Sequence, residues 1–206
     1  IYTPVSVSDS FSTGTASATT AGGAFGYSDG TSVSNVYYDT ETSGMASGVS
    51  GGVSTGVTGL TTSQMTSTIP SGFSSSDWGN QNNQTTPYLT TSDLSQSIPQ
   101  TVYFGNSSSF SPTTPVSLFF SANSLYLISA NLSGNYALGN DIDASAIGLF
   151  SAEGGASPFT GTFDGLGHTI SNLSLNTNLP YVGLFAINAG KIANLNLNGV
   201  SATGSM

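Results

Sequence analysis

The sequence predicts an all-β protein, built from right-handed parallel β-helix (solenoid) segments with a loop-rich connector and one or two short helical turns. Two stretches near the C-terminus, residues 163–176 and 185–198, match each other at a fixed offset of 22 residues. Each contains the pattern Ile-x-Asn-Leu-x-Leu, whose period-two alternation is typical of a half-buried strand. Glycine-rich turns precede both patterns. Such a short β unit must stack on a neighbour to bury its apolar face.

Eight apolar residues of the two stretches are predicted to point into one solenoid core, stacked in register at the 22-residue offset. They are Phe163, Ile170, Leu173, Leu175, Phe185, Ile192, Leu195 and Leu197. Exposure of Leu175 and Leu197 to solvent would argue against this arrangement. Paired strands of neighbouring coils should lie about 4.8 Å apart.

The N-terminal part of the chain repeats the same frame. Residues 23–38 match it with one residue inserted in the turn, and residues 9–14 are predicted to form the strand of the preceding coil, with Asp9 at the asparagine position. The recurrent asparagines are Asn35, Asn172 and Asn194. At a solenoid corner, an asparagine side chain bonds the backbone of its own turn and stacks on the asparagine one coil above. We therefore expect a structural role for these side chains.

The middle of the chain differs from both ends. Residues 61–64 (Thr-Thr-Ser-Gln) fit a capping box before a short helix that ends at Pro70, and residues 43–76 are otherwise expected to be a surface loop. Residues 121–128 are expected to form a short helix that caps the following solenoid, whose first strand would be Tyr136–Leu138.

The predicted domain order is the end of one module followed by the start of another. Residues 1–46 would be the last coils of one β-helix module, residues 47–119 a connector or closing region, and residues 120–206 the first coils of the next module. Because the chain starts inside a coil and stops directly after a coil strand, we expect head-to-tail copies of itself, or neighbouring modules of the same chain, as partners.

Several motifs resemble a known family. Residues 131–143 (Asn-Leu-Ser-Gly-Asn-Tyr-Ala-Leu-Gly-Asn-Asp-Ile-Asp), 159–173 and 182–185 (Val-Gly-Leu-Phe) are similar to the opening of GLUG-motif β-helix domains, and residues 34–44 resemble their closing part. Such domains occur in large bacterial surface adhesins similar to filamentous haemagglutinin, exported by two-partner secretion, and in some surface proteases. The resemblance implies a secreted, cell-surface module of a fibre or biofilm. It carries over no catalytic residue.

Composition narrows the classes of partner. The chain of 206 residues has 10 Asp and Glu against a single Lys, Lys191, and its net charge is -9. One cation cannot neutralise a phosphate backbone or an anionic membrane surface, so we expect no nucleic-acid partner and no membrane insertion. The absence of cysteine excludes disulfides, thiolate zinc sites and cysteine nucleophiles.

Few residues are candidates for chemistry, and we assign no catalytic, cofactor-binding or metal-binding residue. Asp141 and Asp143 share one face of a predicted strand, where we expect them to cap the coil rather than to act as an acid/base pair. His168, four residues after Asp164, would supply half a metal site, although a turn histidine is the simpler interpretation.

The remaining candidates are aromatic residues and glycosylation sequons. Aromatic packing under the connector is favoured over sugar stacking for Tyr37, Tyr38, Tyr103, Tyr126, Tyr136, Tyr181 and Trp78. Four Asn-x-Ser/Thr sequons occur, at Asn83, Asn106, Asn131 and Asn172, and several are expected by chance in so polar a chain. Their glycosylation would require a competent host.

The sequence favours a structural or adhesive module of an extracellular bacterial surface protein, without cofactor or catalysis. The alternative is a polysaccharide-binding or polysaccharide-cleaving β-helix, with host or matrix glycans as partners. A cleft lined by three or more acids or aromatic residues on one solenoid face would support this alternative.

Overall fold

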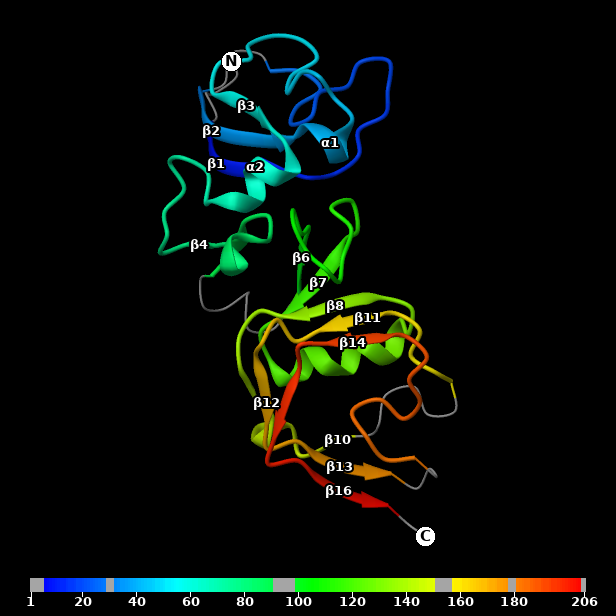
Figure 1. The fold of residues 1–206 in the computed structure, drawn as a ribbon. Coiled ribbons are helices and arrows are strands. Elements are labelled where there is room, and N and C mark those ends of the chain that lie inside the picture. Colours follow the sequence, from blue (N-terminus) through cyan, green and yellow to red (C-terminus); the bar gives the residue numbers. More distant parts are fainter. Residues whose placement is uncertain (1–5, 29–31, 91–98, 151–156, 178–180, 205–206) are drawn as a thin grey trace, which may run out of the picture. The chain divides into compact units, whose positions relative to one another are not determined.

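The computed structural model describes residues 6–28, 32–90, 99–150, 157–177 and 181–204, and these are mostly β with few, short helices (Figure 1). The chain divides into two compact units. Unit 1 comprises Ile1–Thr90, Tyr103–Ser107 and Ser111–Thr113, and unit 2 comprises Thr91–Val102, Ser108–Phe110 and Thr114–Met206. The expectation of a mainly β protein is confirmed, whereas the three-part division at residues 46 and 119 stays a prediction.

Unit 1 is organised around a parallel sheet of three strands in the order β1-β2-β3. Its elements are β1 (Ser6–Ser12), β2 (Ser32–Asp39), α1 (Thr40–Ser43), β3 (Val57–Leu60), α2 (Thr62–Ser67), β4 (Trp78–Gly79), η1 (Gln81–Asn83) and β5 (Tyr88–Leu89). β1 pairs with β2 on both sides of Asp9, with Ser8 opposite Ser34 and Ser10 opposite Val36. The predicted strand around Asp9 is therefore confirmed.

Two carboxylates hold the helices of unit 1 together. Asp39 is fully buried; its Oδ1 accepts hydrogen bonds from the N–H groups of Glu41 and Thr42 at 2.9 and 3.1 Å, and its Oδ2 accepts one from the Thr62 hydroxyl at 2.6 Å. Glu41 Oε2 accepts one from the Thr62 N–H at 2.9 Å. Asp39 therefore caps α1 while it binds the first residue of α2.

The segment predicted as a surface loop is more ordered than expected. The capping box at Thr61 and Gln64 is present and starts α2, which ends before Pro70 as predicted. β3 also lies within residues 43–76, and Met65 is fully buried. The loop expectation is wrong here, because one apolar side chain and the Asp39 contact fix a segment whose composition is polar.

Unit 2 begins with β6 and β7 and continues as three groups of three strands. Its elements are β6 (Gln100–Val102), β7 (Val116–Phe119), η2 (Ala122–Ala130), β8 (Asn135–Leu138), β9 (Ile142–Asp143), η3 (Ser145–Ile147), β10 (Leu149–Phe150), β11 (Thr162–Asp164), β12 (Thr169–Ser171), β13 (Ser174–Thr177), β14 (Lys191–Ala193), β15 (Asn196–Asn198) and β16 (Ser201–Gly204). The helix predicted over 121–128 and the strand predicted over Tyr136–Leu138 are confirmed.

We call β8–β10, β11–β13 and β14–β16 the first, second and third triplets. Each strand of the second triplet pairs in parallel with the corresponding strand of the first and of the third. The sheets are β14-β11-β8-β7-β6, in which β6 and β7 are antiparallel, β15-β12-β9 and β10-β13-β16. Figure 1 shows β8, β11 and β14 side by side, with η2 as the green helix beneath them.

The core of unit 2 lies inside the triplets. Phe119, Phe150, Phe159, Phe163, Ile170 and Leu173 are fully buried there, together with Leu125 and Ile128 of η2. Strands of the first and second triplets, β7 and η2 contribute buried side chains to this core, whereas no described strand residue of the third triplet does. The predicted burial of Phe163, Ile170, Leu173 and Leu175 is therefore confirmed.

The predicted register of 22 residues is wrong. Phe163 is opposite Ile192 and Ile170 is opposite Leu197, whereas the sequence match had aligned Ile170 with Ile192. The shared pattern marks a strand–corner–strand unit rather than a whole coil. It surrounds Asn172 between β12 and β13, but it surrounds Asn194 between β14 and β15. The match therefore compares two different corners.

Burial differs accordingly along the third triplet. Ile192 is 39% exposed and Leu197 is 48% exposed, so the prediction that these two side chains point into the core is wrong. Leu175, on the second triplet, is only 4% exposed. Phe185 and Leu195 are half-buried against the core. β14, β15 and β16 are the outermost strands of their sheets, so no further described strand covers them.

Three glycines at equivalent positions show how the triplets are aligned with one another. Gly134, Gly161 and Gly190 each directly precede the first strand of a triplet. A Cβ atom on Gly161 would overlap the carbonyl oxygen of Gly134, and one on Gly190 would overlap that of Gly161. These carbonyls also accept hydrogen bonds from Thr162 and Lys191 at 3.1 and 2.9 Å. Glycine is required because the backbones approach so closely.

Candidate functional site

The recurrent asparagines form side-chain bonds to aspartates of the preceding turn of chain. In unit 2, Asn172 Nδ2 donates to Asp143 Oδ1 at 3.1 Å, and Asn194 Nδ2 donates to Asp164 Oδ1 at 3.0 Å. In unit 1, Asn35 Nδ2 donates to Asp9 Oδ1 at 2.8 Å. The same pair of residue types thus joins successive turns of chain at three places.

Backbone geometry explains why asparagine is used at these corners. Asn35, Asn172 and Asn194 have φ values of 52, 56 and 49°, and Asp9 has a φ of 49°. This left-handed region is costly for most residues but tolerated by Asn and Asp. The predicted structural role is confirmed, but the partner is corrected. The asparagines bond aspartate side chains, not a stacked asparagine.

The aspartates make the local turn bonds that we had expected from the asparagines. Asp143 Oδ1 also accepts the N–H of Ser145 at 2.9 Å, and Asp164 Oδ1 accepts the N–H of Leu166 at 2.9 Å. Each carboxylate therefore fixes its own turn and the next turn of chain at once. This double use is possible because a carboxylate only accepts and has several lone pairs.

Asp141 and Asp143 flank the buried Ile142 and line a groove of about 340 Å³. The groove is also lined by Phe120, Ser121, Asn123 and Asn140. Two carboxylates and one aromatic side chain therefore line it, which is the minimum of three acids or aromatic residues that the polysaccharide alternative named. Both aspartates lie on one exposed face, as expected, and both cap backbone N–H groups.

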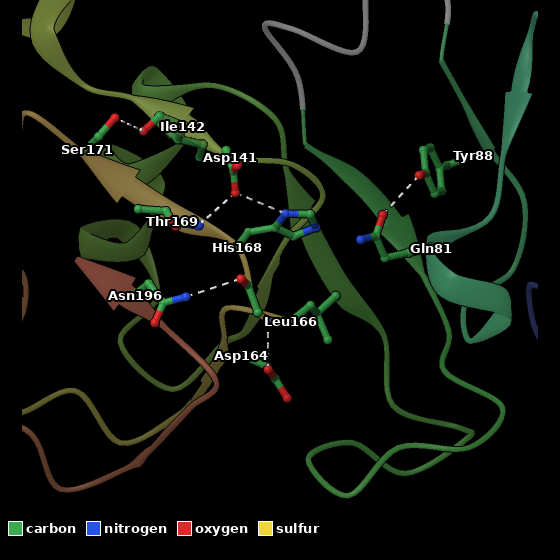
Figure 2. A network of polar contacts seen from close by, with 11 residues as sticks. Gln81, Tyr88, Asp141, Ile142, Asp164, Leu166, His168, Thr169, Ser171 and Asn196 are labelled. Atoms are coloured by element: carbon green, nitrogen blue, oxygen red, sulfur yellow. Dashed lines mark hydrogen bonds and ion pairs between the residues drawn. The ribbon is translucent and has the colours of Figure 1, made fainter. Parts of the chain in front are cut away.

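His168 bonds Asp141, not Asp164. The two atoms His168 Nδ1 and Asp141 Oδ1 are 3.2 Å apart, and the same oxygen accepts the N–H of Thr169 at 2.9 Å (Figure 2). The alternative pairing of His168 with Asp164 is not formed, and Asp164 instead accepts hydrogen bonds from Leu166 and Asn194. Among the residues that the structure describes, no three His, Asp or Glu side chains are placed to share a metal ion.

Hydrogen bonds lower the pKa of both exposed aspartates, Asp141 and Asp143. The Thr169 N–H and then the His168 side chain lower the pKa of Asp141. The Ser145 N–H and then the Asn172 side chain lower the pKa of Asp143. In each case the bonds favour the charged carboxylate.

These shifts predict an acid-sensitive contribution to stability. A carboxyl group with a lowered folded-state pKa stabilises the fold above its unfolded pKa of about 3.9, and this contribution is lost as the pH falls through the folded value. We expect urea unfolding midpoints to decrease less below pH ~4 in Asp141→Asn/Asp143→Asn than in the unmodified chain. Parallel midpoint curves for the two proteins would contradict the assignment.

The other candidate side chains make contacts within the fold. Lys191 Nζ donates to the carbonyl of Ser108 at 2.7 Å. Trp78 packs against Phe11 and Phe73, with ring centroids 5.6 and 4.6 Å apart, and Tyr37 lies edge-on to Phe73. For Trp78 and Tyr37 the expected aromatic packing is confirmed.

The other tyrosines differ in exposure. Tyr38 and Tyr136 are buried, Tyr103 is half-buried, and Tyr126 and Tyr181 are exposed. The two exposed rings belong to unit 2, and only Tyr126 packs on a core ring, that of Phe150, at 4.9 Å. Among these tyrosines, only the exposed rings of Tyr126 and Tyr181 are accessible enough to stack on a sugar.

Comparison with known proteins gives one partial similarity. No family model matches the chain, and no solved structure matches it. The chain is similar to Halomucin of Haloquadratum walsbyi, with 43% identity over 86 residues, which cover 37% of this chain and 1% of that protein. The chain therefore corresponds to a very small part of the curated relative that it matches.

None of the helices in the described part of the chain is both long and apolar enough to cross a membrane.

Proposed function

We propose that this chain is a non-catalytic structural or adhesive module of a cell-surface protein, and that unit 2 is a segment of a right-handed parallel β-helix. One observation carries the proposal. The three strands of each triplet pair in the same order and in parallel with those of the next triplet, around one apolar core. Such a scaffold gains stability from each added coil and offers a long, repetitive surface.

The corners support this interpretation. A β-helix coil must turn sharply between its strands. Asn172, between β12 and β13, and Asn194, between β14 and β15, supply such turns because their backbones adopt the left-handed conformation. The aspartate–asparagine bonds then tie one coil to the next. The resemblance to GLUG-motif and filamentous-haemagglutinin-like domains fits the same architecture and remains part of the proposal.

A location outside the cell is supported by composition and by the partial similarity. The chain lacks cysteine, carries a net charge of -9 and depends on Ser, Thr, Asn and Gly for its polar surface. Halomucin is a protein named as a mucin. Ser- and Thr-rich composition is a feature of mucin-like extracellular segments. We extend a cell-surface location to this chain on these grounds.

The third triplet is the proposed contact face. β14, β15 and β16 are the outer edges of three separate sheets. Apolar area is exposed by Ile192 on β14, by Leu197 on β15 and by Val200 between β15 and β16. An unpaired strand edge is a template for another strand. We propose that a further coil of the same construction stacks there and continues the rod.

Self-association of the purified chain tests this contact. We expect concentration-dependent association in sedimentation velocity, because three edges and three apolar side chains are available at once. Ile192→Asn/Leu197→Asn should weaken association at least tenfold, about 1.4 kcal/mol. Leu127→Asn, on η2 and 45% exposed, is the matched control and should leave association unchanged. A monomer at every concentration would contradict the proposal.

The non-catalytic part has its own test. Purified chain is incubated with plant and bacterial polysaccharides, and release of reducing ends is measured. We expect none above a blank. Turnover that Asp141→Asn or Asp143→Asn abolishes would contradict the proposal and favour the polysaccharide-cleaving alternative.

A further inference from the structure

Fold geometry distinguishes among three of the four sequons of the chain, those at Asn83, Asn131 and Asn172. Transfer of a sugar to an asparagine requires that a transferase reach both the acceptor amide and the hydroxyl two residues later. It also requires an amide nitrogen that can release a proton. The sequons at Asn83, Asn131 and Asn172 differ in both respects.

The Asn83 sequon is blocked at its hydroxyl. Asn83 itself is exposed, but Thr85 is fully buried and its Oγ1 accepts the Gln81 N–H at 3.0 Å. A transferase would therefore have to open unit 1 locally before it could engage this threonine.

The Asn172 sequon is blocked at its amide. Asn172 Nδ2 donates to Asp143, and the residue occupies a left-handed corner between β12 and β13 of the second triplet. A transferase that bound this sequon would have to break the aspartate–asparagine bond and displace the corner.

The Asn131 sequon meets both requirements. Asn131 and Ser133 are exposed and lie in the turn between η2 and β8. Asn131 Oδ1 accepts the Ser133 N–H at 3.2 Å and the Ser133 hydroxyl at 2.9 Å, and no described residue bonds Nδ2. Hydrogen bonds to Oδ1 draw charge from the amide and make its N–H more acidic.

The backbone holds this turn in place. The carbonyl of Asn131 accepts the Tyr136 hydroxyl at 2.6 Å and the Gly134 N–H at 3.1 Å. Tyr136 is itself buried in the core. The sequon is therefore exposed on a turn whose backbone is held by hydrogen bonds, and the Ser133 hydroxyl already contacts the side-chain amide of Asn131.

We propose that, of these three sequons, Asn131 is the one that is N-glycosylated in the folded chain, with a sugar activated through an anomeric diphosphate as the donor. Asn131 Nδ2 forms a bond to the anomeric carbon while the bond from that carbon to the diphosphate oxygen breaks. The diphosphate leaves with the electron pair, and the amide proton passes to a base of the transferase. The inference goes beyond the structural role and does not depend on coil stacking.

Competition among the three sequons tests the proposal. Folded chain carrying Asn106→Gln is labelled in parallel with unfolded peptides of the three sequons, which measure intrinsic preference. One arm uses a nucleotide sugar with a soluble N-glycosyltransferase, and the other a polyprenyl-diphosphate sugar with a membrane oligosaccharyltransferase, each chosen because it labels all three peptides. Mass spectrometry gives the initial rate at each asparagine.

We expect Asn131 in the folded chain to be labelled at nearly its peptide rate. Labelling at Asn83 and Asn172 should fall at least ~10-fold below the peptide rates, since each 1.4 kcal/mol of local opening slows labelling about tenfold. Success in either arm supports the site. Ser133→Ala should abolish labelling at Asn131 alone, with an unchanged circular dichroism spectrum. Folded-to-peptide ratios that are equal at the three sites, or lowest at Asn131, would overturn the proposal.

Discussion

Replacement of Phe163 by alanine is expected to lower the free energy of unfolding of unit 2 by about 3–5 kcal/mol. Phe163 is fully buried on β11, the strand between β8 and β14. Its ring lies 6.5 Å from that of Phe119 and 5.5 Å from that of Phe185. Removal of the ring leaves a cavity among strands that hydrogen bonding holds in place, so the site cannot collapse fully.

Leu197→Ala is the matched control for this prediction. Leu197 lies on β15, in another sheet of unit 2, and is 48% exposed, so its truncation should cost less than about 1 kcal/mol. Urea unfolding followed by circular dichroism measures both variants. Equal losses of stability would show that the second triplet is not the centre of the core.

Replacement of Asp39 by alanine should have the second-largest effect, about 2–4 kcal/mol, in unit 1. The change removes the cap of α1 and leaves the buried Thr62 hydroxyl without its carboxylate acceptor. Both N–H groups of Glu41 and Thr42 lose their partner as well. An unsatisfied buried donor bears the full cost of its lost hydration.

Two comparisons separate these contributions. Asp39→Asn retains one acceptor oxygen and should lose less stability than Asp39→Ala. Thr61→Ala removes only the exposed capping box of α2 and should cost about 1 kcal/mol. Thermal unfolding in one buffer ranks the three variants. A loss for Asp39→Ala no greater than that for Thr61→Ala would contradict the role given to the buried carboxylate.

Local features of the fold could be predicted from sequence because short-range chemistry determines them. The Thr61 capping box depends on four consecutive residues. The corner position of Asn35 depends on its tolerance of a left-handed backbone. The strand around Asp9 follows from the same motif, and the helix before Tyr136 follows from a short apolar segment.

The register could not be predicted from the same pattern. Ile-x-Asn-Leu-x-Leu fits any corner between two strands, so a match between two copies does not show that they occupy the same corner. The glycines Gly134, Gly161 and Gly190 are a better signal, since each directly precedes a triplet and a Cβ atom on Gly161 or Gly190 would overlap the backbone of the glycine before it in the series. They recur ahead of each triplet but are hard to distinguish in a chain with 26 glycines.

The side-chain contacts between triplets could not be predicted without the correct register. His168 meets Asp141, 27 residues earlier, because β12 lies beside β9. The sequence distance between His168 and Asp164 had suggested a pair, but the chain turns between them. Likewise, the bond from Asn194 to Asp164 spans 30 residues and becomes visible only when the triplets are aligned.

Disulfide formation between engineered cysteines tests the stacking of the triplets most directly, because the chain has no cysteine of its own. Ser171 and Asn198 are opposite each other on β12 and β15. Parallel neighbours lie about 4.8 Å apart, within the range of about 4.4–6.8 Å that a disulfide spans.

Ser171→Cys/Asn198→Cys should therefore oxidise rapidly in the folded chain, as measured by loss of free thiols and by mass. Ser171→Cys/Ala193→Cys, which places the cysteines at the 22-residue offset, should stay reduced under the same conditions. Oxidation of the second pair but not the first would contradict the stacked arrangement of the triplets.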